Sequence, residues 1–246
     1  MRPPATCTIR FKEIRRAIAT VGPVSTSSFD EVTWEAFFAA LSVYKQRFSG
    51  KSGQDLAYAR CLAALEGLSM IERAAHAGDI IRFLNSWAAR VSRNEAPAML
   101  AAWISERTEP LERIASLTIA DERLPSHLDE LDALYASLMT AGRAKVRNWS
   151  DAANSKALHQ LVPRVFVMWD KKIKQSARDY RDFMRRMHSL ARGVVRTSPY
   201  PEDRIETELQ SALGYSTRKP LAKYLDEFNV VRVGQIDRPT PGAPVS

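Results

Sequence analysis

Residues 155–170 read SKALHQLVPRVFVMWD, and this stretch decides both the expected fold and the candidate site. Lys156 lies early in a short apolar helix that Pro163 ends, an apolar run follows, and Asp170 is expected to open a long basic helix. A polar group buried in such a segment without a partner costs roughly 2–7 kcal/mol. We therefore expect Lys156 and Asp170 to have a specific role.

Positive charge is concentrated around the same stretch. Residues 141–192 hold 13 Lys or Arg and 4 Asp, a net charge of +9, whereas the whole chain of 246 residues carries +8. All of the net positive charge therefore belongs to this segment. Concentrated Lys and Arg attract phosphate, so the segment predicts a polyanionic partner.

The composition is that of an ordinary globular protein, with 45% hydrophobic and 26% charged residues. Cys7 and Cys61 are far apart and have no metal-ligand spacing, which fits two free thiols in a reducing cytoplasm. No apolar run approaches the ~18 residues of a membrane span, and the N-terminus has no signal-peptide pattern. We expect a soluble cytoplasmic monomer with no membrane partner, metal or cofactor.

Apolar residues recur at helical spacing along the chain, and no run alternates as a strand does. The expected fold is therefore all-α: a compact multi-helix protein whose N-terminal part (residues 1–125) and C-terminal part (residues 126–229) face each other across a basic cleft. Residues 230–246 contain Pro239, Pro241 and Pro244 and are expected to form a loose tail. Helices are predicted over residues 8–21, 29–48, 54–76, 80–91, 98–105, 111–117, 126–142, 170–191, 202–213 and 219–228.

The residues from Ser155 to Ile173 follow the pattern Ser-Lys-x-Leu-His-x-Leu-x-Pro-x-x-Phe-x-x-Trp-Asp-x-x-Ile. This pattern resembles the core of the helix-hairpin-helix DNA glycosylases, which place a Lys after the hairpin and an Asp at the start of a later helix. Residues 148–153 stand where the family has its glycine-rich hairpin.

The resemblance implies roles for two residues. Asp170 would stabilise the oxocarbenium-like sugar as the base departs, and Lys156 would attack the anomeric carbon and form a Schiff base, or orient the substrate if the enzyme is monofunctional. The implied partner is double-stranded DNA with a modified, flipped base. The chain is also similar to compact prokaryotic glycosylases that excise modified bases from phage DNA, which implies a role in antiviral defence.

Other side chains of this segment have expected roles in binding DNA. Trp169 adjoins Asp170 and is the first candidate for stacking on an extruded base, with Trp149, Phe166 and His159 as further pocket residues. Each of these aromatic residues also fits a structural role in a core. A basic stripe on the predicted 170–191 helix is expected to bind DNA phosphates: Lys171, Lys174, Arg178, Arg181 and Arg185.

Two alternatives remain open from the sequence. Arg181 and His188 fit the Arg-x4–6-His pattern of HEPN ribonucleases, which are also all-α. The other alternative is a non-enzymatic helical protein that binds DNA or RNA, in which Lys156 and Asp170 are structural. Substitution of Asp170, His188 or the basic stripe would separate these three functions.

Overall fold

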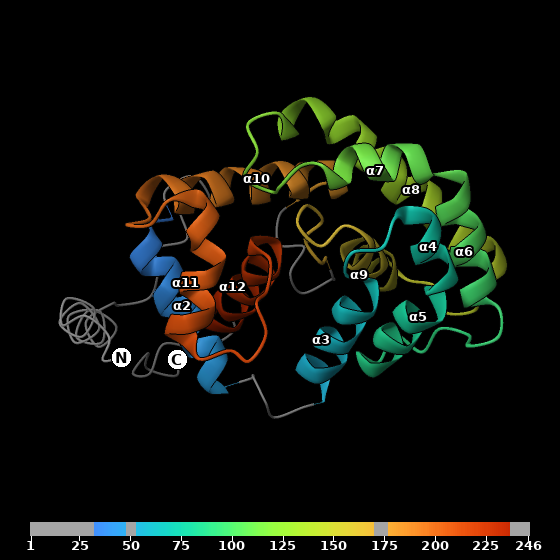
Figure 1. The fold of residues 1–246 in the computed structure, drawn as a ribbon, viewed down its shortest axis with the longest axis horizontal. Coiled ribbons are helices and arrows are strands. Elements are labelled where there is room, and N and C mark those ends of the chain that lie inside the picture. Colours follow the sequence, from blue (N-terminus) through green and yellow to red (C-terminus); the bar gives the residue numbers. More distant parts are fainter. Residues whose placement is uncertain (1–31, 48–52, 170–176, 237–246) are drawn as a thin grey trace, which may run out of the picture.

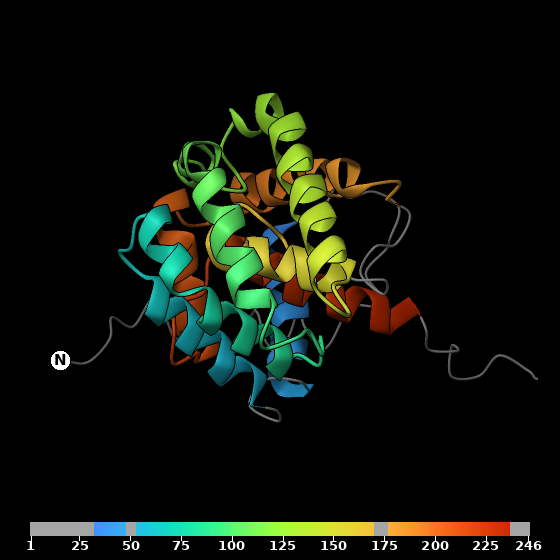
Figure 2. The same cartoon turned by 90° about the vertical axis from the view of Figure 1, so that its right-hand side faces the viewer.

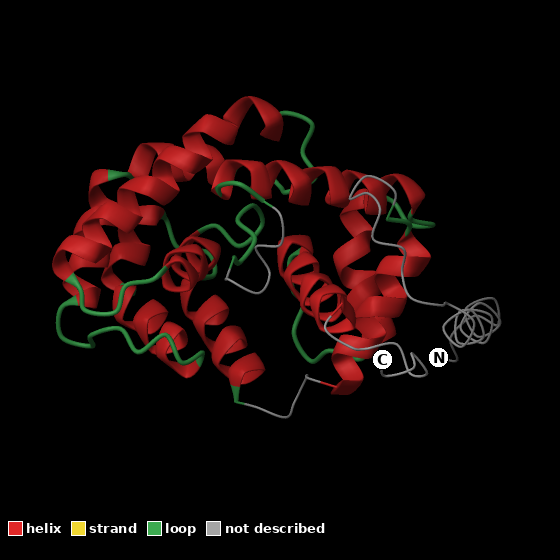
Figure 3. Ribbon diagram, turned by 180° about the vertical axis from the view of Figure 1, so that it is seen from behind, coloured by secondary structure: helices red, strands yellow, loops and turns green. Residues whose placement is uncertain are grey.

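The computed structural model describes residues 32–47, 53–169 and 177–236, of which 233–236 are described in their backbone only. These residues form helices and connecting loops, without strands (Figure 3). The all-α prediction is confirmed for this part of the chain. The helices are α2 (Trp34–Arg47), α3 (Gln54–Leu65), α4 (Met70–Ala75), α5 (Ala77–Ser86), α6 (Ala96–Glu106), α7 (Thr108–Ala115), the 3-10 helix η2 (Leu124–His127), α8 (Leu128–Lys145), α9 (Asp151–Leu161), α10 (Tyr180–Thr197), α11 (Glu202–Leu213) and α12 (Leu221–Ile236).

The helix predicted over residues 54–76 is broken into α3 and α4. Gly67 has φ = +75°, a left-handed conformation that glycine adopts without steric cost. Ser69 then caps α4: its hydroxyl accepts from the N–H of Glu72, and the Glu72 carboxylate accepts from the N–H of Ser69. This reciprocal capping box starts a new helix and explains the break.

The long basic helix begins later than predicted. Residues 170–176, including Asp170, Lys171 and Lys174, lie outside the described residues, and 177–179 are not helical. The helix α10 begins at Tyr180 because Asp179, with extended backbone, accepts a hydrogen bond of 2.7 Å from the N–H of Asp182. Arg178 therefore precedes the helix.

Several other predicted boundaries are wrong; the helix predicted over residues 80–91, for example, is α5 and ends at Ser86. α8 continues past Gly142 to Lys145, and α9 begins at Asp151, where Ser150 caps it, so that Lys156 lies at its middle. α12 extends to Ile236, so the first residues of the expected tail are helical. Helix formation at these ends follows from packing against neighbouring helices, which overrides local signals.

The helices form two groups that do not follow the expected boundary at residue 125. α2 packs against α10, α11 and α12, although it comes from the N-terminal region (Figure 1). The second group contains α3 to α9, with α6 between α4, α5 and α8. α10 connects the groups because it also packs on α8, as the side view in Figure 2 shows.

A single hydrophobic core runs through both groups. Its members include Phe37 of α2, Phe83 of α5, Phe166 in the loop after α9 and Phe228 of α12, all almost completely buried. Phe37 and Phe228 meet with their ring centroids 5.4 Å apart, so the first and last described helices share this core. No described helix has the length and apolar character needed to cross a bilayer.

We predict that Gly142→Ala will destabilise the fold. A β-carbon at this position would lie 2.2 Å from Cδ1 of the buried Trp149 ring, so the ring or the helix must move. Overpacking of this kind costs about 1–3 kcal/mol in the free energy of unfolding, measurable by urea denaturation.

The matched control is Gly78→Ala in α5, where a β-carbon meets nothing within 4 Å. Alanine is the better helix former, so this variant should be unchanged or stabilised by up to about 1 kcal/mol. Equal stability of the two variants would contradict the predicted contact at Gly142.

Candidate functional site

The side chain of Ser155 holds the backbone of Trp169. Its hydroxyl donates to the carbonyl of Trp169 at 2.8 Å and accepts from the N–H of the same residue at 2.9 Å. All of these atoms are buried, so each bond satisfies a group that would otherwise be costly. We call this pair of bonds the Ser155–Trp169 bracket. It fixes residue 169, fourteen positions away, beside the middle of α9.

Lys156 follows Ser155 and is almost buried. The residue is 9% exposed. Its ammonium lies 4.9 Å from the ring centroid of Trp87, at the C-terminal end of α5. The aromatic face attracts a cation at this distance. The lysine therefore reaches into the protein and is not a solvated side chain.

His159, on the same helix, is enclosed and fully hydrogen-bonded. Its Nε2 lies 2.9 Å from the Tyr58 hydroxyl and its Nδ1 lies 2.5 Å from the carbonyl oxygen of Phe166. A neutral ring with the proton on Nδ1 satisfies both partners, because Nδ1 donates and Nε2 accepts from the hydroxyl. Burial lowers the pKa of His159 to about 4. His159 therefore has a structural role, and its buried ring has no exposed face on which a nucleobase could stack.

Trp169 and Phe166 belong to an aromatic cluster with Tyr135, Tyr180 and Phe183. Trp169 stacks on Tyr180 at a centroid distance of 5.3 Å and on Phe183 at 5.7 Å, and Tyr135 stacks on Tyr180 at 4.0 Å. Trp169 is 6% exposed and Phe166 is completely buried. The cluster joins α8, α10 and the loop after α9. Base stacking by Trp169 or Phe166 would require this packing to open.

Trp149 also has a structural place in the described residues. Its indole N–H donates to Asn154 at 2.9 Å, and the Asn154 amide donates to the carbonyl of Tyr135 at 2.8 Å. The neighbouring Asn148 has φ = +66°, a left-handed conformation, and its amide donates to the carbonyl of Arg90. The loop before α9 is therefore fixed by the side chains of Asn148 and Asn154.

Two of the three described arginines of the basic stripe, Arg181 and Arg185, are paired with acidic side chains, and Arg178 donates its backbone N–H to Asp182. Arg181 lies 2.7 Å from Asp129, and Arg185 and Arg186 both contact Asp182. These pairs are partly exposed and contribute little to stability, so the arginines remain available to exchange partners. Phosphate binding by the stripe stays a prediction.

Arg181 and His188 point to different neighbours. Arg181 pairs with Asp129 on α8, and Nδ1 of His188 lies 2.9 Å from the carbonyl oxygen of Ile119. Seven residues along a helix correspond to a rise of about 10 Å. This arrangement does not bring the two side chains together as a catalytic pair.

Among the described residues, the strongest concentration of buried charge lies on α12 and in the loop just before it, and it was not predicted from the sequence. Lys219 lies 2.6 Å from Glu227, Lys223 lies 2.6 Å from Asp226 and 3.6 Å from Glu227, and Tyr215 donates to Glu227 at 2.9 Å. We call Lys219, Lys223, Asp226 and Glu227 the α12 ionic cluster. The four residues are 0–4% exposed, and their formal charges cancel.

Aromatic rings surround the lysines of this cluster. The Lys223 ammonium lies 5.2 Å from the centroid of Trp87 and 5.6 Å from that of Tyr58, and the Lys219 ammonium lies 3.7 Å from that of Tyr215. Burial opposes the charged form of Lys223, but Asp226, Tyr44 and Glu227 outweigh it and raise the pKa of the lysine well above its ordinary value. Trp87 therefore contacts two ammonium groups, those of Lys156 and Lys223.

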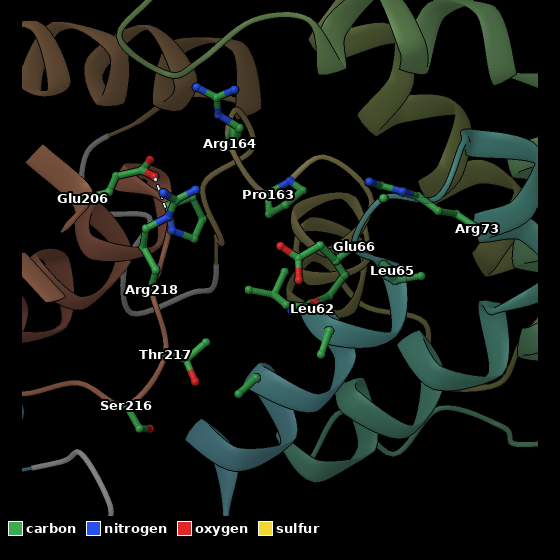
Figure 4. Close-up of a pocket in the computed structure, with 15 residues that line it drawn as sticks. Leu62, Leu65, Glu66, Arg73, Pro163, Arg164, Glu206, Ser216, Thr217 and Arg218 are labelled. Atoms are coloured by element: carbon green, nitrogen blue, oxygen red, sulfur yellow. Dashed lines mark ion pairs between the residues drawn. The ribbon is translucent and has the colours of Figure 1, made fainter. Parts of the chain in front are cut away.

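A cavity of about 530 Å³ opens beside these groups, between α3, the C-terminal end of α9 and the loop before α12 (Figure 4). It lies between the two helix groups, where a basic cleft was expected. Three arginines and two glutamates contribute to its lining, so its charge is mixed: Arg73, Arg164, Arg218, Glu66 and Glu206. The sequence pattern gave no sign of it, because its residues come from five separate segments.

Comparison of the chain with protein-family models, with curated proteins and with solved structures gives no match. The described residues contain no group of three His, Cys, Asp or Glu side chains that could hold a metal ion.

One signal of the α12 ionic cluster was present in the sequence. Residues 219–227, KPLAKYLDE, place Lys223 three and four positions before Asp226 and Glu227, a spacing that joins oppositely charged side chains on a helix. Such spacing is usual on exposed helices. Only the packing of α2 and α5 shows that this charged face is buried.

We predict that Lys223→Met will lower the free energy of unfolding by about 3–5 kcal/mol, because it leaves Asp226 buried without its cation. Lys223→Met with Asp226→Leu should recover most of this loss, since the buried pair is removed together. Urea denaturation measures both.

The control is Lys145→Met at the exposed end of α8, expected to change stability by less than about 0.5 kcal/mol. If the single and double variants at 223 and 226 were equally unstable, the loss would come from packing and not from the unpaired charge.

We also predict that His159 makes the protein sensitive to acid. Its pKa is about 4 in the fold and 6.5 in an unfolded chain, so between these values only the unfolded state binds the proton. This contribution to stability is complete above pH 6.5 and is lost as the pH falls towards 4, by up to about 3 kcal/mol.

Urea denaturation at pH 7 and pH 4.5 would measure this loss. His159→Gln cannot take up the proton, so its stability should change less between the two pH values than that of the unmodified protein. An equal change in both proteins would show that other groups cause the acid sensitivity.

Proposed function

We propose that the protein is a DNA glycosylase that releases a modified base, with Asp170 and Lys156 as its catalytic residues. The observation that carries this proposal is the Ser155–Trp169 bracket. Lys156 and Asp170 each follow one of the two bonded residues in the chain. The bracket holds Trp169, the described residue that precedes Asp170 in the chain, against the helix that bears Lys156.

The position of Lys156 supports a chemical role. Its ammonium lies 4.9 Å from the ring centroid of Trp87, which the Lys223 ammonium also contacts, and the residue is 9% exposed. A catalytic amine must be held in place and partly desolvated, and both conditions apply to this side chain. A lysine on an exposed helix face would satisfy neither.

The proposed reaction breaks the bond between C1′ of the sugar and a base nitrogen, and the base leaves with the bonding electrons. The carboxylate of Asp170 stabilises the cation that develops on the sugar. Water or the Lys156 amine then forms the new bond to C1′, and the proton that this nucleophile loses passes to the departing base or to solvent. Attack by the amine gives, after ring opening, a Schiff base and strand cleavage.

A DNA glycosylase must also attract DNA, and the positive charge of the segment around Lys156 and Asp170 supports this. Residues 141–192 carry a net charge of +9, and Arg185 and Arg181 are about half exposed on α10. Binding through phosphates would fall steeply as the salt concentration rises, because condensed counterions are released. Release of modified bases from phage DNA, in antiviral defence, is the biological setting that we propose.

We predict that Asp170→Asn will bind duplex DNA as the unmodified protein does and release base at least 100-fold more slowly, because the neutral amide cannot stabilise the sugar cation. Base release is measured on duplexes that carry modified bases, and DNA binding by fluorescence anisotropy. Asp203→Asn, on the exposed surface of α11, is the matched control and should keep full activity. Full activity in Asp170→Asn would refute the proposal.

Borohydride treatment during the reaction separates the two roles of Lys156. Reduction of a Schiff base would give a covalent DNA adduct that is missing from Lys156→Ala and present in Lys145→Ala. Base release without an adduct in the unmodified protein would assign the attack to water and leave Lys156 as an orienting cation.

A further inference from the structure

The cavity of about 530 Å³ has the size of a small-molecule site. Leu62 and Leu65 of α3 form one apolar wall, and Pro163 and Pro220 lie on the opposite elements. Figure 4 shows Arg164, Arg218 and Glu206 on one side of the cavity and Arg73 on the other. The cavity therefore combines apolar walls with a small number of polar groups, as ligand sites do.

Gln160 is the residue in the cavity lining that most needs a ligand. It is completely buried, it lines the cavity, and neither its amide nitrogen nor its amide oxygen has a hydrogen-bond partner. A buried amide without partners costs about 1–3 kcal/mol for each unsatisfied group. A fold can keep such a residue if a bound molecule supplies the missing donor and acceptor.

The arginines of the cavity add positive charge that the glutamates of its lining offset only in part. Arg73 donates only to backbone carbonyls, those of Leu68 and Leu161, and burial lowers its pKa. Arg164 makes no ion pair with any described residue, and Arg218 lies 3.8 Å from Glu206, a long contact. Guanidinium groups bind phosphate in a bidentate manner, so this arrangement favours a ligand with a phosphate.

We propose that the cavity binds one nucleotide, with the edge of its base hydrogen-bonded to Gln160 and its phosphate held by Arg164 and Arg218. A glutamine amide matches the adjacent donor and acceptor of a base edge. The leucine and proline walls cover the apolar faces of the base. Glu66 and Glu206 leave the lining with a formal charge of only +1, which suits one phosphate better than a long polyanion.

The nucleotide has two possible sources, free in solution or extruded from DNA. Gln160 lies four residues after Lys156, so both side chains are on one face of α9, and this spacing corresponds to a rise of about 6 Å. An extruded nucleotide would then bring its sugar towards Lys156. In that form the inference deepens the proposed function and depends on it, whereas binding of a free nucleotide does not.

Two variants test the cavity. Gln160→Met keeps the volume and removes both polar groups, and Arg164→Gln removes one cation. The control is Arg60→Gln, on the exposed side of α3 and outside the cavity lining. All are made in the Asp170→Asn background, so that no base is released. Isothermal titration calorimetry measures the binding of the four deoxynucleoside monophosphates, the matching deoxynucleosides and inorganic phosphate. A separate fluorescence assay uses a duplex that carries 2-aminopurine, whose fluorescence rises when this base leaves the stack.

We expect at least one monophosphate to bind more tightly than its nucleoside and than phosphate, or the 2-aminopurine signal to rise when the protein is added. Gln160→Met should weaken the binding at least tenfold without lowering the melting temperature of the protein. Arg164→Gln should weaken the binding of the monophosphate but not that of the nucleoside. Binding of free monophosphates alone would identify the source as solution, and a signal with the duplex would identify it as DNA.

The inference is overturned if none of the monophosphates binds and the duplex signal stays flat, or if Gln160→Met binds as the unmodified protein does. If the glycosylase proposal failed, Asp170→Asn would still release base. Gln160→Met would nevertheless still lose nucleotide binding, so the two failures can be told apart.

Discussion

The two hydrogen bonds between the Ser155 hydroxyl and the Trp169 backbone hold the central part of this protein together. They are buried, and they join α9 to the end of a loop whose earlier residues are held by hydrogen bonds from Ile119, His159 and Tyr180. The loop in turn supports the aromatic cluster through Trp169 and accepts the His159 hydrogen bond through Phe166. The Ser155 hydroxyl therefore fixes Trp169, at the end of this loop, against α9.

The buried charges on α12 show how the same region tolerates polar residues in a core. Each lysine has a carboxylate at 2.6 Å, and aromatic faces cover the remaining surface of the ammonium groups. The pairing offsets the desolvation of the charges without making a large net contribution to stability. Gln160 is the contrasting case, because its amide groups have no such partners. A satisfied cluster points to structure, and an unsatisfied amide beside a cavity points to a ligand.

The two helix groups meet where these features lie. α2 is separated in sequence from α10, α11 and α12 but packs with them, while α3 begins the other group. Elements from both groups line the cavity, so a molecule bound there would touch both. Lys156 on α9 and Lys223 on α12 meet at the ring of Trp87, which makes this ring one of the points of contact between the groups.

The sequence by itself determined the all-α class, the positions of most helices and the apolar stripe of α10, because helical periodicity and capping residues act over a few neighbouring positions. It also singled out Ser155, Lys156 and Trp169 as parts of one pattern. Only the tertiary structure decided that α10 begins at Tyr180, that His159 and Trp149 are enclosed, and that the charged face of α12 is buried. These outcomes depend on contacts between segments that are far apart in the chain, such as Tyr58 with His159 and Trp87 with Lys223, and local sequence carries no record of which distant surface a side chain will meet.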